Sequence, residues 1–589
     1  MTESHSQRLR RARPVLAIAL VAFAIGAIVG AHRSPSPASA LAERFAAAWT
    51  RGDYASMYAD IDVRSQRATS PSEFAAAYRR ALSTATAYRL GLRGRVRSIE
   101  GGAIDVPVTV RTRLFGTLAL DYALRVAPGG ESAPRLEWSR SLAFPGLHPG
   151  ETLTRRTTLP RRAALLARDG SVLAESGSSE TSGAPAEGTR SSPLGESARA
   201  VLGTVGPIPS SRLASLEAAG VPAEASVGLT GLERALDDRL RGAPGGVLLA
   251  GSRVLGSARS RAAPAVRTTI LPALQSAAVL ALGGQLGGVV ALQPSTGQIL
   301  AVAGIGLDGL QPPGSTFKII TVTGALQANV ATPRTVYPYA THATLDGVKL
   351  SNANGEECGG SLELAFTVSC NSVFSPLGVK LGAPRLVAAA EAFGFNHDPG
   401  LPGAAESTLP PAASIQGELD VGSTAIGQGQ VQATPLEMAI VAATIADGGR
   451  RPAPRFLPDA TPAAVGRATS ASVARTVRHL MIDVVRSGTG TAAAIPGVVV
   501  AGKTGTAELK SACPSNTQTG SSETEPSPPE GCAGSESQAS NTDAWFASFA
   551  PAIHPRIAVC VMLVKDGAGG ATAAPVARQV LEAGLRALR

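Results

Sequence analysis

From about residue 265 to its end, the chain alternates between apolar runs of strand length and apolar runs of helix length, and this feature restricts the fold most. A helix is expected over 272–282 and another over 574–588. Two apolar runs, 288–292 and 299–302, flank a Pro-Ser-Thr-Gly turn and are expected to form a hairpin. These elements predict an α/β domain over 265–589.

The first of three polar motifs in this region is Ser315-Thr316-Phe317-Lys318, which directly follows Pro312-Pro313-Gly314. Prolines and a glycine ahead of an apolar run indicate the start of a helix. Ser315 and Lys318 are three residues apart, so they share one helical face. Free N–H groups at a helix N-terminus favour a serine alkoxide and an oxyanion. A lysine that its surroundings deprotonate can act as the base, so the motif predicts a nucleophile and its base.

Lysine is scarce in this chain, because only six of the 54 basic residues are lysines. A buried lysine can lose its proton, whereas arginine effectively cannot. Lys318 and Lys503 both stand in motifs and are candidates for chemistry. The remaining four are assigned no role: Lys349, Lys380, Lys510 and Lys565.

The second and third motifs are Ser369-Cys370-Asn371, in a helical stretch, and Lys503-Thr504-Gly505-Thr506, after the apolar strand 498–501. In the second motif the hydroxyl can relay a proton and the carboxamide can hydrogen-bond a substrate amide. In the third, the lysine and hydroxyls can hold a carboxylate, and a glycine on an edge strand lets a ligand backbone approach. Taken singly, each motif also has an ordinary structural explanation, as residues of a helix turn or a strand end.

In this order, the motifs match the SxxK, SDN and KTG set of class A β-lactamases and penicillin-binding proteins. The segments around them match as well: Gly427-Gln428-Gly429, 434–439, 488–493, 502–508 and Ala544-Trp545-Phe546. Residues 265–589 therefore resemble the transpeptidase domain of class B penicillin-binding proteins, which has a serine β-lactamase-like α/β fold.

The resemblance implies a peptidoglycan D,D-transpeptidase that forms wall cross-links through a serine acyl-enzyme and is a target of β-lactams. It implies that Ser315 attacks the penultimate D-Ala carbonyl of a stem peptide and that Lys318 is the general base. It also implies that Ser369 passes a proton to the leaving amine. The implied substrate-binding residues are Asn371, Lys503, Thr504, Gly505 and Thr506. No metal or organic cofactor is implied.

The N-terminus carries four arginines ahead of an uncharged apolar run over 15–31. That run is near the lower length limit for a membrane-spanning helix, and the preceding arginines place the N-terminus in the cytoplasm. The expectation is a cytoplasmic tail (1–14), a single-pass signal anchor in the cell membrane (15–31) and an extracytoplasmic remainder. Ala38-Ser39-Ala40 resembles a signal-peptidase site, so cleavage stays open as an alternative.

Residues 41–145 have the pattern of a small α+β domain. Helices are expected over 41–61 and from Ser70-Pro71-Ser72-Glu73 onward, and strands over 106–110, 118–124 and 136–142. Pro107 favours an edge position for the first strand. This region resembles the nuclear-transport-factor-2-like domain that opens methicillin-resistance-type penicillin-binding proteins.

Residues 146–262 resemble the linker or dimerisation domain of penicillin-binding proteins in two segments, 161–174 and 228–233. A stretch rich in Ser, Gly, Thr and Glu over 177–193 predicts a flexible loop. The whole chain is therefore expected to be a multidomain α+β protein with an N-terminal anchor.

The five cysteines show no CxxC spacing, so zinc and redox motifs find no support. In an exported protein, Cys358–Cys370 and Cys513–Cys532 are hypothesised disulfides. The second would close a Ser/Pro/Glu/Gly-rich insertion between Lys510 and Asn541. Cys560 lies in an apolar strand and is expected to be buried and free.

Four alternatives to a transpeptidase stay open: a β-lactamase, a β-lactam sensor, a D,D-carboxypeptidase and an inactive scaffold. The expected partners are peptidoglycan stem peptides, β-lactams, the membrane and other cell-wall synthesis proteins. The net charge is +10, but the arginines are spread along the chain, which argues against nucleic-acid binding.

Overall fold

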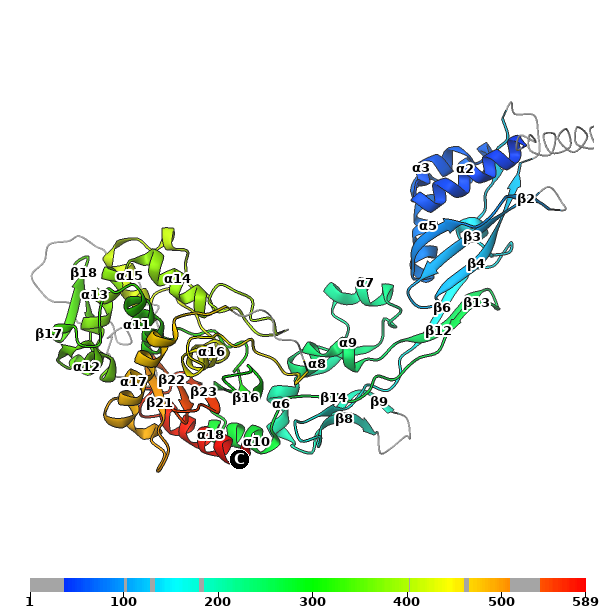
Figure 1. Ribbon diagram of the computed structural model, residues 1–589. Coiled ribbons are helices and arrows are strands. Elements are labelled where there is room, and N and C mark those ends of the chain that lie inside the picture. The colour runs from blue at the N-terminus through cyan, green and yellow to red at the C-terminus, as the bar shows by residue number, and fades with distance from the viewer. Residues whose placement is uncertain are drawn as a thin grey trace, which may run out of the picture. The chain divides into compact units, whose positions relative to one another are not determined.

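The computed structural model describes residues 36–99, 103–127, 133–178, 185–401, 403–459, 466–508 and 541–589. The chain divides into two compact units (Figure 1). The first comprises Met1–Pro160, Ile208–Ala225 and Ala243–Arg261, and the second comprises Arg161–Pro207, Ser226–Gly242 and Ala262–Arg589. Segment 146–262 therefore contributes to both units.

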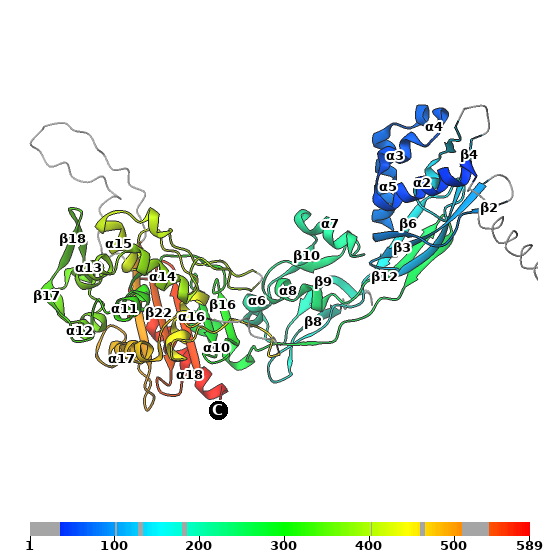
Figure 2. The same cartoon turned by 45° about the horizontal axis from the view of Figure 1, so that its top comes forward.

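The first unit packs helices against a sheet of order β1-β3-β4-β5, with β2 also paired to β3 (Figure 2). A second sheet, of order β13-β12-β6, belongs to the same unit. Large aromatic side chains fill its core, among them Trp49, Phe74, Tyr78 and Tyr122. The elements are α2 Pro37–Arg51, α3 Tyr54–Ala59, α4 Val63–Ala68, α5 Pro71–Thr84, β1 Ala87–Leu92, β2 Arg97–Ser98, β3 Ala103–Thr112, β4 Thr117–Val126, β5 Leu136–Glu137, β6 Leu153–Thr158, α7 Ser210–Ala218, β12 Gly245–Ala250 and β13 Arg253–Ala258.

The helix predicted over 41–61 is two helices. Gly52 ends α2 in the left-handed conformation (φ 71°), and Asp53 then caps α3 by accepting a hydrogen bond from the Ser56 N–H. The predicted start of the next helix is confirmed, since Ser70 and Glu73 form a capping box at the N-terminus of α5.

The edge position predicted from Pro107 is wrong, because β3 pairs with β4 on one side and with β1 and β2 on the other. The carbonyl of Pro107 accepts a hydrogen bond from the Arg93 N–H, at the break between β1 and β2. The nitrogen of a strand residue points to the same side as its carbonyl. The missing N–H of Pro107 therefore faces that break, and the ladder with β4 loses no hydrogen bond.

The second unit begins with a sheet of order β14-β7-β8-β9 and the short pair β10–β11. Its elements here are β7 Leu165–Leu166, β8 Val172–Ser178, β9 Pro185–Ser191, α6 Glu196–Leu202, β10 Val205–Pro207, β11 Ser226–Gly228, α8 Gly231–Ala235, α9 Asp237–Leu240 and β14 Val266–Arg267. The flexible loop predicted over 177–193 is wrong for β9, which pairs antiparallel with β8.

A buried ion pair stands at the centre of this region. Glu233, which is fully buried, accepts hydrogen bonds from Arg162 and Arg190, each at 2.6 Å. A buried carboxylate is stable only when cations and hydrogen bonds compensate it. This accounts for the glutamate of the segment 228–233.

The centre of the second unit is an antiparallel five-stranded sheet of order β16-β15-β23-β22-β21. Helices α10 and α18 pack together on one face, and α16 contacts β15, β22 and β23 on the other (Figure 1). Its strands are β15 Gly287–Leu292, β16 Ile299–Gly304, β21 Ala501–Glu508, β22 Thr542–Ala550 and β23 Ile557–Leu563. The remaining elements are α10 Pro272–Leu282, η2 Gly314–Phe317, α11 Lys318–Gln327, β17 Val336–Ala340, β18 His342–Leu345, β19 Val348–Ser351, β20 Cys358–Ser361, α12 Leu362–Thr367, α13 Asn371–Leu381, α14 Ala383–Phe393, α15 Gly417–Ala425, α16 Pro435–Ala446, α17 Ala471–Ser487 and α18 Ala573–Ala587.

Three of the element predictions for this region are confirmed. The helix expected over 272–282 is α10, the last helix is α18, and β15 pairs with β16 as the expected hairpin. Among the described residues, no helix has the length and apolar character needed to span a membrane. The anchor predicted over 15–31 lies outside those residues.

One predicted disulfide is confirmed: Cys358 and Cys370 are bonded, with their Cα atoms 5.9 Å apart. Cys560 is buried in β23 with a free thiol, as expected. Cys513, Cys532 and the insertion that they bracket lie outside the described residues.

Candidate active site

Ser315 and Lys318 lie at the junction between η2 and α11. Ser315 is half-buried in the 3₁₀ turn η2, and Lys318 is the first residue of α11. The α-helix thus begins at the lysine rather than at the serine. The Lys318 N–H donates to the Ser315 carbonyl, so one tight turn joins the two residues.

The Ser369-Cys370-Asn371 motif, predicted in a helical stretch, forms the turn between α12 and α13. Ser369 has a positive φ of 61°, a left-handed conformation that side chains seldom adopt. Asn371 is the first residue of α13. The turn points both polar side chains toward Lys318, which a straight helix would not do.

Lys503, Thr504, Gly505 and Thr506 lie within β21, the edge strand of the central sheet, rather than after a strand. A Cβ added to Gly505 would lie 2.6 Å from the Pro313 carbonyl, and one added to Gly314 would lie 2.7 Å from the Thr506 carbonyl. Both glycines therefore allow η2 to pack against β21. The sequence predicts that Gly505 makes room for a ligand backbone, and the structure shows that it also makes room for the turn that carries Ser315.

The three motifs converge on one cluster of polar atoms. The ammonium group of Lys318 donates to the Asn371 Oδ1 at 2.6 Å and to the Ser369 carbonyl at 2.7 Å. Lys503 donates to the Ser369 Oγ at 2.7 Å, and Lys318 lies 3.5 Å from the same oxygen. The Ser369 hydroxyl is therefore shared between two lysines that are 185 positions apart in the sequence.

Burial changes the charge of both lysines. Lys318 and Lys503 have no exposed surface, and their ammonium groups lie 5.4 Å from the Phe374 ring and 5.5 Å from the Phe366 ring. Burial, and then the charge of Lys503, holds the pKa of Lys318 well below its usual value. Burial lowers the pKa of Lys503 to about 7. A lysine of this kind can accept a proton near neutral pH.

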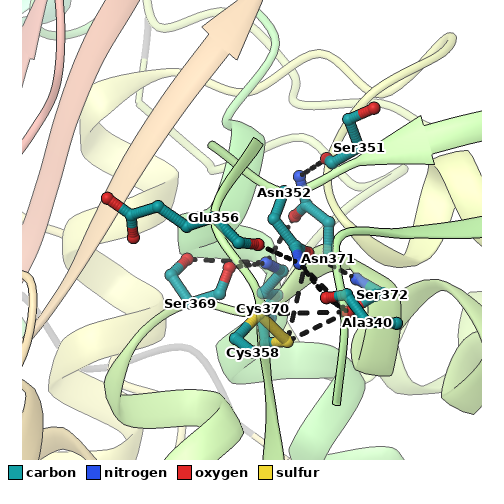
Figure 3. The surroundings of a disulfide bond; sticks show 10 residues. Ala340, Ser351, Asn352, Glu356, Cys358, Ser369, Cys370, Asn371 and Ser372 are labelled. Atoms are coloured by element: carbon teal, nitrogen blue, oxygen red, sulfur yellow. Dashed lines mark hydrogen bonds between the residues drawn. A yellow bond between two sulfur atoms is a disulfide. The ribbon is translucent and has the colours of Figure 1, made fainter. Parts of the chain in front are cut away.

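Two groups of contacts at the site were not singled out from the sequence. The Thr489 hydroxyl lies 2.6 Å from the Thr504 hydroxyl, whereas the sequence assigns the segment 488–493 no role beyond its resemblance to the family. The Ser351 carbonyl accepts from Asn371 Nδ2 at 2.8 Å, and Asn352 binds the backbone of Ser372 (Figure 3). No local pattern marks Ser351 or Asn352, because their roles depend on the fold that brings β19 to α13.

A serine at a tight turn, two buried amines of lowered pKa and a polar edge strand together make the arrangement of a serine acyl-transferase. Three family models match the chain. The penicillin-binding protein transpeptidase domain matches residues 287–582, the penicillin-binding protein dimerisation domain matches 184–253, and the NTF2-like N-terminal transpeptidase domain matches 37–151.

Individual relatives agree with these models. The peptidoglycan D,D-transpeptidase PbpA of Mycolicibacterium smegmatis is 36% identical over 428 residues, which cover 61% of this chain and 80% of that protein. A ceftriaxone acyl-enzyme complex of penicillin-binding protein A from M. tuberculosis aligns with a TM-score of 0.55 at 30% identity, covering 72% of this chain and 98% of that one. The D,D-transpeptidase domain of a peptidoglycan glycosyltransferase from Eggerthella lenta aligns with the same score, identity and coverage.

The chain belongs to the penicillin-binding protein transpeptidase family, with the N-terminal, dimerisation and transpeptidase domains of the class B architecture.

Proposed function

We propose that this chain cross-links peptidoglycan as a serine D,D-transpeptidase that β-lactams acylate, and that Ser315 is its nucleophile. Ser315 attacks the penultimate D-Ala carbonyl of a donor stem peptide and expels the terminal D-Ala. The amine of a second stem peptide then takes the acyl group and releases the serine. The names of the relatives and the family match support this chemistry.

The observation that carries the residue roles is the meeting of two buried lysines at the Ser369 hydroxyl. Neutral Lys318 takes the proton of Ser315, and Ser369 passes a proton on to the leaving amine. The hydrogen bond from Lys503 to Ser369 Oγ and the short contact of Lys318 with Asn371 support these roles.

The edge strand β21 supplies the rest of the site. Lys503, Thr504 and Thr506 hold the substrate carboxylate, and Asn371 holds a substrate amide. The backbone N–H groups of Ser315 and Thr506 form the oxyanion hole, for which the close packing of η2 on β21 is the support. Such a donor contributes about 3 kcal/mol to transition-state stabilisation in other acyl-transferases.

The test uses the exported portion of the chain, residues 33–589, and a fluorescent penicillin on a denaturing gel. A stable label that is absent in Ser315→Ala supports the proposal. A label that turns over in seconds indicates a β-lactamase, and no label on folded wild-type protein indicates a scaffold. Incubation with a stem-peptide donor and an amine acceptor then distinguishes a transpeptidase from a D,D-carboxypeptidase. The transpeptidase yields a cross-linked product, whereas the carboxypeptidase yields a donor that has lost its terminal D-Ala, and the two products differ in mass.

We also propose that residues 15–31 anchor the chain in the cell membrane, with residues from 32 onward outside. The uncharged run and the arginines before it support this placement. Full-length protein should sediment with membranes, whereas the chain that begins at residue 33 should not. Mass spectrometry of the membrane-derived protein shows whether the segment is cleaved.

A further inference from the structure

The turn that carries Ser369 needs support from outside itself. The backbone-to-backbone hydrogen bonds of Ser369 and Cys370 stay within residues 365–374: the Ser369 N–H donates to Phe366, the Cys370 N–H donates to Ala365, and the Cys370 carbonyl accepts from Phe374. Ser369 is also held in the left-handed region, at φ 61°, which a side chain enters only when its surroundings impose it. The groups that pack behind this turn therefore determine where its polar side chains point.

Asn352 is the first of these groups (Figure 3). Its side chain is 6% exposed, and both ends of the carboxamide are used. Its Oδ1 accepts from the Ser372 N–H at 2.8 Å, next to Asn371. Its Nδ2 donates to the Ala340 carbonyl at 2.7 Å and to the Glu356 carbonyl at 2.8 Å. One side chain thus connects the first turn of α13 to the end of β17 and to the loop before β20.

The disulfide Cys358–Cys370 is the second group. Cys370 is the middle residue of the motif, and Cys358 is the first residue of β20. The Ser372 hydroxyl lies 3.2 Å from the Cys370 sulfur and 3.2 Å from Asn352 Nδ2, between the two supports (Figure 3). We call Asn352 and this disulfide together the SxN brace.

The brace reaches Lys318 through Asn371. Asn371 Nδ2 donates to the carbonyl of Ser351, the neighbour of Asn352, while its Oδ1 accepts from Lys318. The carboxamide of Asn371 therefore hydrogen-bonds to β19 at one end and to Lys318 at the other. A shift of the first turn of α13 would break one of these two hydrogen bonds.

We propose that Asn352 is a positioning residue, which with the disulfide holds Ser369 and Asn371 in register with Lys318. Among the described residues, Asn352 hydrogen-bonds to neither Ser315 nor the three carboxylate-binding residues, so it acts through the turn. This inference rests on the proposed function, because the rate that it controls is the acylation of Ser315.

The test compares Asn352→Ala with Lys349→Ala in the chain 33–589. The second change is the control, because Lys349 lies nearby in β19 with an exposed side chain. The acylation rate by fluorescent penicillin is measured across pH and penicillin concentration. The acylation rate is divided by the final label amplitude, which gives a rate per molecule that can be labelled and leaves out unfolded molecules.

Asn352→Ala is expected to slow acylation by ~10- to 100-fold per competent molecule, since a displacement of about 1 Å has this effect on aligned groups. The fold decrease in the maximal acylation rate should be larger than the fold increase in the penicillin concentration that gives half of that rate. Lys503 faces Lys318 from β21. Water that enters beside Lys318 would reduce its burial, and burial is what lowers the pKa of Lys318. The acidic limb of the pH profile should then move to higher pH. Lys349→Ala should match wild type.

A rate per labelled molecule and a pH profile equal to those of wild type would overturn the proposal, even if the variant melts earlier. If Asn352→Ala fails to fold, Asn352→Asp takes its place, since it keeps the acceptor for the Ser372 N–H and loses the donors to Ala340 and Glu356. An intermediate rate is then expected, and a wild-type rate with a wild-type pH profile contradicts the role of Asn352.

The disulfide is tested with reductant on wild type and on a Cys358→Ala/Cys370→Ala variant. Reductant should slow acylation of wild type and leave the variant at its own slower rate; equal rates in all four samples remove the disulfide from the brace. Hydrogen exchange at the Ser372 amide gives a readout that does not need activity. If wild type is not labelled, the proposed function fails, and unchanged exchange in Asn352→Ala would separately refute the brace.

Discussion

At the scale of single residues, the chemistry depends on two amines that the fold removes from water. Lys318 and Lys503 are both fully buried, which lowers the pKa of each, and the charge of Lys503 lowers the pKa of Lys318 further. Arginine in either place would keep its charge, because its guanidinium does not deprotonate in proteins. Lysine is scarce in this chain, and at these two positions its presence indicates a requirement for an amine that can lose its proton.

Lys318→Arg is expected to keep the positive charge and lose the base. Acylation of Ser315 should fall by ~100- to 10,000-fold, the usual contribution of a positioned acid or base. Labelling by fluorescent penicillin measures this rate. Lys380→Arg is the control, since Lys380 is exposed at the end of α13 and should behave as wild type. Equal labelling of both variants would show that Lys318 is not the base.

Lys503→Met is expected to stabilise the protein while it disables the site. The fold lowers the pKa of Lys503 to about 7, whereas the unfolded chain keeps the ordinary pKa of lysine. At a pH between these two pKa values the unfolded chain therefore binds more protons than the folded chain. Stability of the wild type therefore rises with pH through this window, and the cost of the buried charge is full below it. The variant should melt a few degrees higher at about pH 6 and lose most of this gain by about pH 10. Calorimetry at one scan rate checks this, and a gain that is constant with pH would contradict it.

At the scale of elements, the site is made by the packing of one turn on one strand. The turn η2 lies against β21 because Gly314 and Gly505 present no Cβ at the contact. Sequence periodicity located α10, α18 and the β15–β16 hairpin, since each has a clear pattern of its own. It placed Lys503 after a strand and Ser369 in a helix, because polar residues interrupt the apolar pattern at both places.

Gly505→Ala is expected to push η2 away from β21. Its Cβ would lie 2.6 Å from the Pro313 carbonyl oxygen and 3.0 Å from Thr316 Cγ2. Neither atom is the end of a long, flexible side chain that could move away. Overpacking of this kind costs about 1–3 kcal/mol, and displacement of Ser315 should slow acylation by ~100-fold. Melting and labelling are measured beside Gly466→Ala, whose Cβ would contact nothing within 4 Å. A Gly505→Ala protein that labels like this control would show that the contact does not position Ser315.

At the scale of the whole molecule, the second unit extends beyond the α/β region that carries the motifs. Its core includes Leu165, Val201 and Leu232 together with residues of the central sheet. Hydrogen bonds connect the same parts, from the Arg168 N–H to Ile270 and from Gln275 to the Ser197 carbonyl. All three motifs lie within 265–589, yet that stretch is not a complete packing unit.

A fragment of residues 265–589 is expected to be much less stable than the chain 33–589. Burial of each large aliphatic side chain contributes about 1.5–3 kcal/mol, so loss of the three partners named above removes an amount comparable with a typical net stability of about 5–15 kcal/mol. The fragment should bind a hydrophobic dye, melt at lower temperature and take up less fluorescent penicillin. Equal melting temperatures for the two proteins would show that the earlier segments add nothing to this core.

Local patterns of residue types were enough to predict the family, the order of the three motifs, the start of α5, the helices α10 and α18, and the β15–β16 hairpin. The sequence also indicated the Cys358–Cys370 pair and the buried thiol of Cys560. The folded structure was needed to show that Ser369 lies in a turn between two helices with its side chain toward Lys318 and Lys503. It was also needed to show that Pro107 fits an interior strand and that Asn352 lies behind the motif. These features depend on contacts between segments far apart in the chain, such as Lys503 with Ser369. Local periodicity carries no information about which distant backbone a side chain will meet.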